Sequence, residues 1–401
     1  MSVIVQKFGG SSVADVEKIK KIAGLIAAVK KQGYDVVAVV SAMGKTTNQL
    51  IEQAKSLSKD PEKRELDMLL STGERISMAL LCIALNELGI KAISLTGSQS
   101  GIITNDRYND ARVIEVRPFR VQDELAKGMV VVIGGFQGVS YKRDITTLGR
   151  GGSDTSAVAM AAALNAERCE IYSDVDGVYT TDPNLLKEAK HLPELSFQQL
   201  QEMSEAGAKV LNAQAVQFAK ESKIAIYARS TFQSGRETII REAKPSDRIS
   251  VIAVVHENDV IRIIHTEQSN RDINIILDFL EEKEISVKEL NLVPGIKAED
   301  SRLSFVISKN NVHSWEKIRE ELTERFKDKI LIDQSLGAVS LIGEGFSRDN
   351  RIIAETISIL SENNIFIQGL TTTSFRVSVL IRNDVVKEAV EVLHNRWITK
   401  D

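Results

Sequence analysis

The chain has 401 residues, of which 43% are hydrophobic and 26% charged, with a formal net charge of -4. That length exceeds what one hydrophobic core usually holds, so it predicts two or three domains. The small, mixed charge gives no reason to expect nucleic acid or an anionic membrane as a partner. The start resembles no signal peptide, and the apolar stretch 78–85 fits a core helix, so we expect a soluble, cytoplasmic protein.

The first 240 residues alternate short β-branched runs with helical patterns. Apolar residues spaced three and four apart over 16–31 predict a helix that packs on a sheet. The runs between such helices are mostly continuously apolar, as in strands covered on both faces. The alternation predicts a largely parallel sheet between layers of helices, with ligands bound where strands end and helices begin. The predicted strands are 3–7, 36–41, 92–95, 129–136, 169–173 and 224–229.

The second part changes character after a polar segment, 241–250, which contains Pro245 and predicts a linker. Eight strand patterns and four helical patterns follow, enough for two β-α-β-β-α-β units. The strands are 249–255, 260–265, 285–292, 303–308, 330–333, 338–342, 365–370 and 375–381, and the helices are 272–283, 312–326, 350–361 and 385–397.

The second of these units ends on a helix with no strand left to complete it, and the spare strand is 249–255. We therefore expect the first unit, 260–335, to be inserted between two parts of the second, 249–256 plus 336–401. The domains would be 1–240 and 241–401. Paired units of this kind behind an α/β domain suggest a regulatory module, although a dimerisation domain without a ligand has the same topology.

Two glycines follow the first strand in Lys7-Phe8-Gly9-Gly10, just before a helix that should begin near Asp15. Glycines let main-chain N–H groups approach an anion, and a lysine at the strand end adds a mobile positive charge. An ordinary strand-turn-helix connection with a solvated lysine has the same sequence. The later stretch VVSAMGKTTNQL imitates a P-loop, yet Val39 stands where that loop needs a glycine.

Three further turns carry polar residues. In TTLGRGGSDTSA, Arg150 between glycines can grip a carboxylate, whereas Ser153 or Asp154 could simply cap the next helix. In STGE, Glu74 opens a helix, where the dipole favours it and where it would also suit a ligand ammonium. The loop SDVDGVYTTDP follows a buried strand and is rich in ordinary turn formers.

Together these segments resemble the aspartate kinases, within the amino acid kinase fold. VQKFGGSSV, MLLSTGE, SLTGSQSGI and TTLGRGGSDTSAVA are the selective signatures, while DVDGVYTTDP is shared more widely in the superfamily. The resemblance covers the whole chain, most closely residues 2–232. It implies a three-layer α/β sandwich with a mainly parallel sheet, followed by two ferredoxin-like ACT units. It also implies ATP-dependent phosphorylation of the β-carboxylate of L-aspartate to 4-phospho-L-aspartate, the first step of lysine, threonine, methionine and diaminopimelate biosynthesis.

Residue-by-residue matching assigns implied roles. Lys7 should contact the transferred phosphoryl group and Asp154 should lie at the reacting centre. The other implied ATP contacts are Gly9, Gly10, Ser12, Ser41, Ser173, Asp174, Tyr179, Asp182, Pro183, Lys209 and Val210. The implied aspartate contacts are Thr47, Phe136, Glu74 for the α-ammonium, and Arg150, Gly151 and Ser153 around the α-carboxylate.

The resemblance implies ATP with Mg²⁺, and the metal should arrive with the nucleotide because the sequence contains no dedicated cage of carboxylates. The five histidines lack ligand spacing, and Cys82 and Cys169 lie far apart in apolar surroundings. The cysteines therefore predict two buried thiols rather than a disulfide, and neither residue type predicts a metal site.

Some positions depart from the family pattern. Asn48 stands where aspartate is common, and Asn212-Ala213-Gln214 replaces His-Pro-Arg. In the ACT region, HTEQSNRDI lacks an expected glycine and NIFIQGLTTTSFRVSVLI replaces a segment with Ser-Glu, while Gly343 and Gly345 remain. Inhibition by lysine, threonine or both is therefore a hypothesis, and we expect a homo-oligomer, either a dimer or a tetramer.

Two alternatives belong to other classes. A glutamate 5-kinase would share the loop SDVDGVYTTDP, which we call the nucleotide loop, but would lack KFGGSSV and LLSTGE. A non-enzymatic amino-acid sensor would keep the second half and lose Lys7, Glu74 or Arg150, all of which are present.

Overall fold

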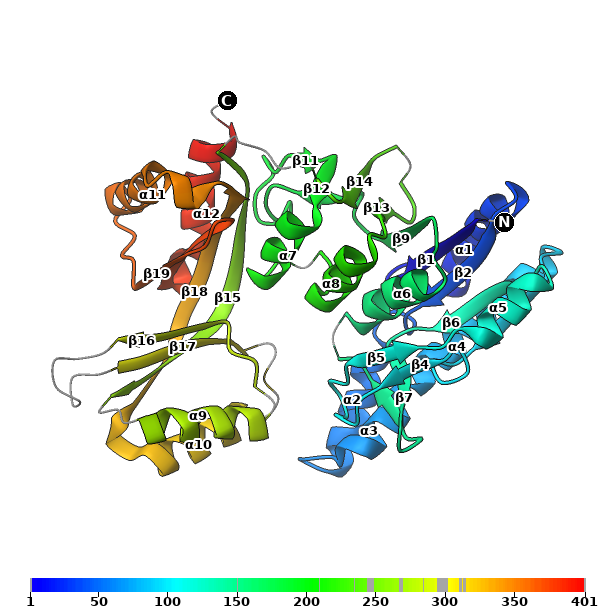
Figure 1. Cartoon of the computed structure of the whole chain (residues 1–401), viewed down its shortest axis with the longest axis horizontal. Helices are drawn as coiled ribbons and strands as arrows, with labels where there is room; N and C mark the ends of the chain where they lie inside the picture. The colour runs from blue at the N-terminus through cyan, green and yellow to red at the C-terminus, as the bar shows by residue number, and fades with distance from the viewer. Residues whose placement is uncertain are drawn as a thin grey trace. The chain divides into compact units, whose positions relative to one another are not determined.

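The computed structural model describes residues 2–149, 151–208, 210–233, 235–243, 249–266, 270–283, 285–293, 302–309, 312 and 315–399. Its contacts divide the chain into two compact units (Figure 1), and each unit is described by itself. The first comprises Met1–Tyr179, His191–Ser204 and Lys209–Pro245, and the second comprises Thr180–Lys190, Glu205–Ala208 and Ser246–Asp401.

A mainly parallel sheet of eight strands lies at the centre of the first unit, in the order β12-β14-β13-β9-β1-β2-β6-β3. Every neighbouring pair is parallel except β13 with β14. The six predicted strands are confirmed, and β12 and β14 extend the sheet beyond them. The strands are β1 Val3–Phe8, β2 Asp35–Val40, β3 Ala92–Leu95, β6 Val130–Gly134, β9 Arg168–Ser173, β12 Glu194–Ser196, β13 Ile226–Ser230 and β14 Glu237–Arg241.

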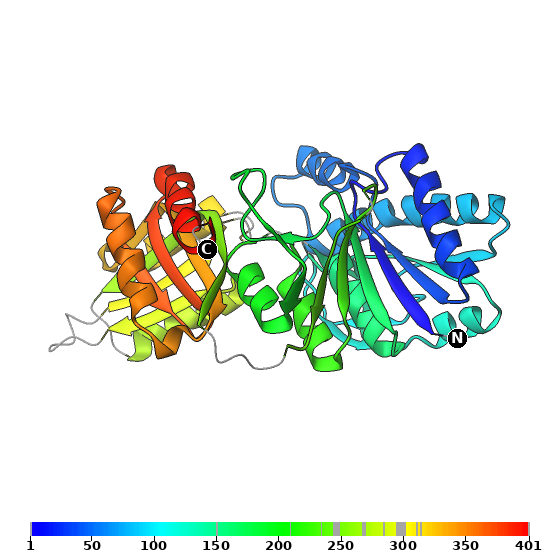
Figure 2. The same cartoon turned by 90° about the horizontal axis from the view of Figure 1, so that it is seen from above.

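Helices cover both faces of this sheet (Figure 2). On one face lie α1 (Val16–Lys31) and α4 (Thr72–Glu87), and on the other lie α6 (Gly152–Ala163) and α8 (Ala213–Ser222). The start of α1 is confirmed, because the Asp15 side chain caps it by accepting a hydrogen bond from the Lys18 N–H at 2.8 Å. The residues of α6 from 152 to 161 are buried all round, which its alanine-rich sequence permits.

A smaller sheet of four short strands, in the order β5-β4-β7-β8, was not predicted from the sequence. Its strands have only three or four residues, too few to display a clear alternation. They are β4 Ile102–Thr104, β5 Val113–Val116, β7 Gln137–Ser140 and β8 Ile145–Thr147. The first unit also contains α2 Thr46–Leu57, α3 Lys63–Leu70, α5 Phe119–Ala126, α7 Phe197–Glu205 and the hairpin β10 Val178–Tyr179 with β11 His191–Leu192.

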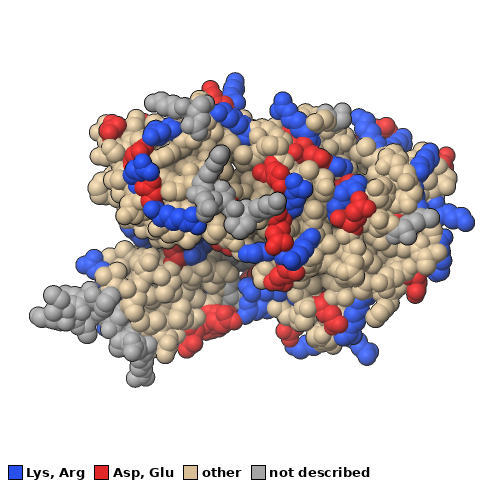
Figure 3. Space-filling view, turned by 45° about the horizontal axis from the view of Figure 1, so that its top comes forward, with Lys and Arg blue, Asp and Glu red and all other residues tan. Residues whose placement is uncertain are grey.

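The apolar stretch predicted as a core helix is part of α4, where Met78, Leu81 and Leu85 are buried in the main core. Judged only by length and composition, Lys63–Glu87 could cross a membrane, but half of its most apolar window is buried inside the protein. Both cysteines are buried and free, as predicted, and burial raises the pKa of the Cys82 thiol to about 12. Figure 3 shows cationic and anionic side chains interspersed over the visible face, in keeping with the small net charge.

The second unit is built on one antiparallel sheet, in the order β16-β17-β15-β18-β20-β19. The four helices predicted here are confirmed, with shifted ends. They are α9 Asn270–Glu282, α10 Trp315–Phe326, α11 Arg351–Glu362 and α12 Val386–His394. The strands are β15 Ser250–Thr266, β16 Glu289–Val293, β17 Arg302–Ser308, β18 Ile330–Glu344, β19 Gly369–Thr372 and β20 Arg376–Arg382.

Two pairs of predicted strands are wrong as separate elements. The runs 249–255 and 260–265 form the single strand β15, and 330–333 and 338–342 form the single strand β18. The polar residues 257–259, which separate the first two of these predicted strands, form a bulge at which Asp259 takes a φ of 58° and the strand continues. One half of β15 places Val254 opposite Leu341, and the other places Ile263 opposite Ile332.

Two segments that lie within the first 240 residues belong to the second unit by their contacts. The Thr180 carbonyl accepts a hydrogen bond from the Val254 N–H at 2.7 Å, and Leu185 packs on the core of α11 and α12. Of the predicted linker, residues 244–248 lie outside the described residues.

A glycine at the end of β6 allows two layers to meet closely. A Cβ on Gly135 would lie 2.8 Å from Ser153 Cβ and 2.8 Å from Val39 Cγ1. Neither atom can yield without moving α6 or β2, so we expect Gly135→Ala to lower the free energy of unfolding by about 1–3 kcal/mol in urea denaturation.

The matched control is Gly24→Ala in α1, because no atom lies within 4 Å of its added Cβ. Alanine is favoured over glycine in an exposed helix, so this variant should gain about 0.5–1 kcal/mol. A Gly135→Ala variant as stable as the parent would show that the two layers do not meet at this glycine.

Candidate active site

Two oppositely charged side chains meet at the carboxyl end of the central strand. Lys7 Nζ lies 2.6 Å from Asp154 Oδ1, and each side chain is only 11% exposed. Lys7 is on β1, between β2 and β9, and Asp154 is in the first turn of α6. A charge pair shielded from water interacts more strongly than one at the surface, so this pair can hold the strand end and the helix start together.

The turn after Lys7 is packed too closely for side chains. A Cβ on Gly10 would lie 3.0 Å from the Ala42 carbonyl oxygen, and the Gly10 carbonyl accepts a hydrogen bond from the Gly44 N–H at 3.0 Å. The SAMG segment therefore supports the first glycine turn through main-chain contact and does not wrap a phosphate by itself. The Gly9 N–H is bonded to the Tyr172 carbonyl at 3.2 Å.

Glu74 is a buried carboxyl with one oxygen left free. Its Oε1 accepts a hydrogen bond from the Ala42 N–H at 3.0 Å, its Oε2 has no partner among the described residues, and the residue is 2% exposed. Burial raises the pKa of this carboxyl from 4.5 to about 7. A buried oxygen without a partner costs free energy, and a bound ammonium group would satisfy it.

Neighbouring residues connect the Lys7–Asp154 pair with Glu74. Ser41 Oγ lies 2.9 Å from Ser153 Oγ, so the residue before Ala42 contacts the residue before Asp154. The Ser77 hydroxyl in turn donates to the Ser41 carbonyl at 2.8 Å. The predicted residues Lys7, Asp154, Ser153, Ser41 and Glu74 therefore form one continuous group at the ends of β1 and β2 and the starts of α4 and α6.

The helix α6 starts in an unusual way. Its N-cap is Gly151, in a left-handed conformation with φ 74° and without a capping side chain, so the alternative that Ser153 or Asp154 caps the helix is wrong. A helix start without a side-chain cap favours an anion. A Cβ on Gly151 would lie 3.0 Å from Asn212 Cβ, so the departure at position 212 adjoins this turn. Asn212 caps α8 through the Gln214 N–H.

Phe136 has a left-handed φ of 68°, which is rare for a bulky residue. Its N–H donates to Ser156 Oγ at 3.1 Å and its carbonyl accepts from the Leu148 N–H at 2.8 Å. Both contacts reach the glycine turn and helix that carry Asp154. Thr47, another predicted substrate contact, is half-buried in α2.

The predicted nucleotide residues are distributed over several elements. Ser173 ends β9, where its carbonyl accepts from the Thr231 N–H at 2.9 Å, and Asp174 beyond it is exposed. The Tyr179 hydroxyl donates to Asp176 Oδ1 at 2.5 Å. Ser12 is fully buried with its Oγ 2.6 Å from Thr231 Oγ1, so it ties the glycine turn to β13.

Three predicted nucleotide residues lie apart from that group. Asp182 and Pro183 are in the segment that belongs to the second unit, and Val210 lies three residues before the start of α8. Arg150 and Lys209 lie outside the described residues. Within the described part of the chain, no group of three His, Cys, Asp or Glu side chains could hold a metal ion.

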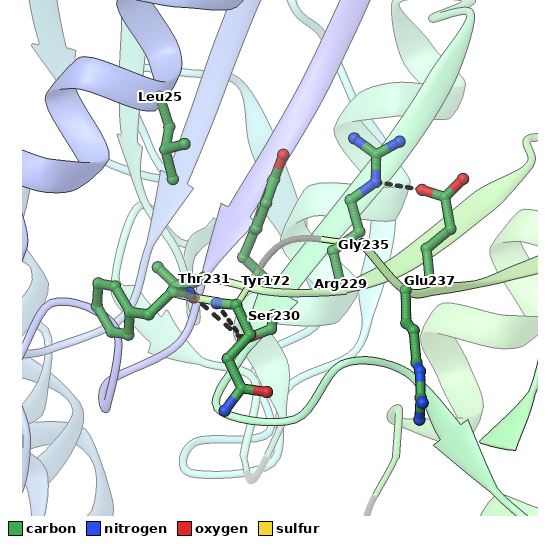
Figure 4. Close-up of a pocket in the computed structure, with 10 residues that line it drawn as sticks. Leu25, Tyr172, Arg229, Ser230, Thr231, Gly235 and Glu237 are labelled. Carbon is green, nitrogen blue, oxygen red and sulfur yellow. Dashed lines mark hydrogen bonds and ion pairs between the residues drawn. The ribbon is translucent and has the colours of Figure 1, made fainter.

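A pocket of about 480 Å³ is lined by Leu25 of α1, by Tyr172 near the end of β9 and by residues from the end of β13 to the start of β14. Figure 4 shows the side chains that line it. None of the predicted site residues lines it. Its Arg229 is held by two carboxylates, Glu237 at 2.6 Å and Glu170 at 2.9 Å, which together more than balance its single positive charge.

The sequence analysis did not identify three residues, Ala42, Thr231 and Asp67, that hold the predicted site residues or their segments in position. Ala42 acts through its main chain and Thr231 through contacts with Ser12 and Ser173, and neither type of contact leaves a signal in a motif. Asp67 is fully buried on α3, just before the STGE turn, and its position on a face shared with Leu70 was the available signal.

Comparisons with known proteins agree over the full length. The model of the Amino acid kinase family matches residues 2–230, and an ACT domain model matches residues 339–397. An aspartokinase of Bacillus sp. (strain MGA3) is 39% identical, covering 99% of this chain and 97% of the relative. Aspartokinase 2 of Bacillus subtilis (strain 168) is also 39% identical, covering 99% and 98%.

Two solved structures of E. coli aspartokinase III share the fold. The complex with aspartate and ADP, in the R-state, has a TM-score of 0.85 at 22% identity and covers 98% of this chain and 99% of that one. The complex with lysine and aspartate, in the T-state, has a TM-score of 0.71 at 23% identity, with 99% of each chain covered.

The raised pKa of Glu74 predicts a pH-dependent stability. Because the folded protein favours the protonated carboxyl, wild-type stability should fall as pH rises from about 4.5 to about 7. Glutamine does not titrate, so Glu74→Gln should become the more stable protein across that window, by up to about 3 kcal/mol at pH 8. Urea unfolding at pH 4.5 and pH 8 measures this difference.

The control is Glu87→Gln, an exposed position at the end of the same helix. This variant shows how the free energy of unfolding changes when an exposed carboxylate is removed from α4. If the Glu74 and Glu87 variants responded to pH alike, the burial of Glu74 would not be the cause.

Proposed function

The chain belongs to the aspartokinases of the amino acid kinase family, and we propose that it transfers the γ-phosphoryl group of ATP to the β-carboxylate of L-aspartate. It is a kinase whose acceptor is a carboxyl group. The product would be 4-phospho-L-aspartate, the starting point of lysine, threonine, methionine and diaminopimelate biosynthesis.

The observation that carries this proposal is the Lys7–Asp154 contact of 2.6 Å at the end of β1. A β-carboxylate has an ordinary pKa near 4 and is already ionised at neutral pH, so it needs no general base. What it needs is relief from repulsion by the phosphates it attacks. We infer that Lys7 supplies positive charge there, and losing one such contact typically costs about 10²–10³ in rate.

The same group of residues has a place for the two ends of the amino acid. The free Oε2 of Glu74 suits the α-ammonium, and the uncapped start of α6 with Gly151 and Ser153 suits the α-carboxylate. We expect Arg150 to complete the carboxylate contact and Thr47 and Phe136 to line the pocket. Ser41 and Ala42 join these positions through their contacts with Ser153 and Glu74, and we propose that one small ligand contacts both Glu74 and Asp154.

We expect ATP to contact the matched residues Lys7, Gly9, Gly10, Ser12, Ser41, Ser173, Asp174, Tyr179, Asp182, Pro183, Lys209 and Val210. The tie from Ser12 to Thr231 keeps the glycine turn against the end of β9. Mg²⁺ bound to the phosphates would neutralise their charge. Asp154 would be the carboxylate available to that ion, because oxygen ligands of this kind suit Mg²⁺.

The second domain, 241–401, is in our proposal a regulatory pair of ACT units, one inserted in the other. One of the E. coli aspartokinase III structures is a complex with lysine, which supports an amino-acid effector here, lysine or threonine or both. We further propose a cytoplasmic homo-oligomer, either a dimer or a tetramer.

Lys7→Ala should lower kcat by about 10²–10³, because the attacking and transferred anions lose their shared cation. ATP-dependent hydroxamate formation with aspartate measures this directly, with glutamate run alongside as the competing acceptor. Lys20→Ala, which removes a 62% exposed lysine paired to Glu17 on α1, is the matched control and should keep full activity. Full activity of the Lys7 variant, or preference for glutamate, would refute the proposed function.

Effector control is tested by adding lysine, threonine and both together to the same assay. We expect inhibition by at least one of these additions, because an ACT unit that binds an amino acid couples that binding to the state of the enzyme. Activity that stays flat up to millimolar concentrations of both amino acids would rule out this regulation.

A further inference from the structure

A second buried carboxylate, Asp67 of α3, contacts the segment that leads into the proposed substrate site. It is fully buried, and its hydrogen-bond partners among the described residues are neutral donors. The Thr147 hydroxyl donates to Oδ1 at 2.6 Å and the Thr147 N–H to Oδ2 at 2.8 Å. The Asn109 N–H lies 3.0 Å and 3.1 Å from the two carboxylate oxygens. One side chain thus joins α3 to two segments that are distant in the sequence.

The two segments that Asp67 holds meet at Gly149. Thr147 is the last residue of β8, and Asn109, with a left-handed φ of 69°, lies in the connection between β4 and β5. A Cβ on Gly149 would lie 3.3 Å from the Asn109 carbonyl oxygen and 2.8 Å from Asp110 Oδ1. Asp67 therefore sets the spacing of both sides of the glycine turn that leads into α6.

The position of Thr147 is transmitted to the reacting groups through the next few residues. Leu148 is buried, its N–H is bonded to the Phe136 carbonyl at 2.8 Å, and a Cβ on Gly152 would lie 2.6 Å from Leu148 Cβ. Leu148 thus presses directly on the first residue of α6. Ser153 and Asp154 follow in the same turn of helix, so a shift of Thr147 moves them.

We propose that Asp67 is a positioning residue of the acceptor site. By holding Thr147 and Asn109 it fixes the start of α6, and with it the hydroxyl of Ser153 and the carboxylate of Asp154. This role rests on the proposed function, because it assigns to those two residues the contacts with aspartate and the transferred group.

A carboxyl group at this position costs stability. Burial raises the pKa of Asp67 to about 6, against the opposing effect of its hydrogen bonds, and the carboxylate of Glu62 adds to the rise. An apolar side chain would avoid that cost but would leave the buried N–H groups of Thr147 and Asn109 without an acceptor. A charged residue kept in an unfavourable place is the pattern expected where position serves activity.

The chemistry of the contacts makes asparagine the conservative replacement. Its amide oxygen can accept from the N–H groups of Thr147 and Asn109, while its NH₂ group donates to the Thr147 hydroxyl. Alanine retains none of these bonds. Thr147→Val removes only the hydroxyl donor and keeps the main-chain N–H, and the double variant Asp67→Asn with Thr147→Val leaves the asparagine NH₂ without its acceptor.

The experiment is two-substrate kinetics on the full chain, with thermal unfolding of each variant as a check on folding. Asp67→Ala should raise the KM for aspartate about tenfold or more, because small misplacements of binding groups have large effects. The KM for ATP should stay within about twofold, since Gly9 and Ser173 are held by Tyr172 and Thr231 instead. Asp67→Asn should recover most of the aspartate affinity. Glu65→Gln, the same kind of change at an exposed site on α3, should behave as wild type.

A purely structural role would reduce the amount of active enzyme and leave both KM values unchanged, and that result would overturn the proposal. So would an equal rise in both KM values. If Asp67→Ala does not fold, the double variant Asp67→Asn with Thr147→Val decides. Its KM for aspartate should exceed that of either single variant, and a KM for aspartate equal to that of the wild type would reject the role. An error in the proposed substrate site would be recognised by a different variant. In that case Glu74→Gln would have the same KM and kcat with aspartate as the wild type.

Discussion

The site depends on one ion pair, between Lys7 at the end of β1 and Asp154 at the start of α6. A buried charge is costly alone, so each partner keeps the other in place, and together they join the central strand to the helix packed above it. A cation held in this way is already positioned at the strand end before an anion arrives, and charges positioned in advance contribute most to electrostatic catalysis.

The rest of the first unit brings other groups close to this pair, at some expense in stability. Gly10, Gly135 and Gly152 let main chains approach more closely than a Cβ permits. Glu74 and Asp67 carry carboxyl groups whose pKa values burial raises to about 7 and about 6. Each of these features weakens the fold, and each lies in or supports a segment of the proposed site, where binding groups must be held in defined positions.

The second unit follows a different plan. Two strands, β15 and β18, each run through both halves of its sheet, so the halves share main-chain hydrogen bonds rather than meeting only through side chains. The segment Thr180–Lys190, which continues the nucleotide loop, packs with this unit through Val254 and Leu185. Residues expected to bind nucleotide are therefore attached to the part of the chain that we propose to bind an effector.

From the sequence alone came the parallel sheet, the helix pattern and the glycine turns, because apolar periodicity and turn chemistry are local properties. The roles expected of Lys7, Glu74, Ser153 and Asp154 came from the resemblance of their motifs to those of the aspartate kinases. The continuity of β15 through a polar bulge, the short strands of the second sheet and the spread of Asp182 and Ser173 over two units were decided by tertiary pairing. So were the contacts of Ala42, Thr231 and Asp67. These depend on main-chain atoms and on segments up to 219 residues apart, about which a local pattern carries no information.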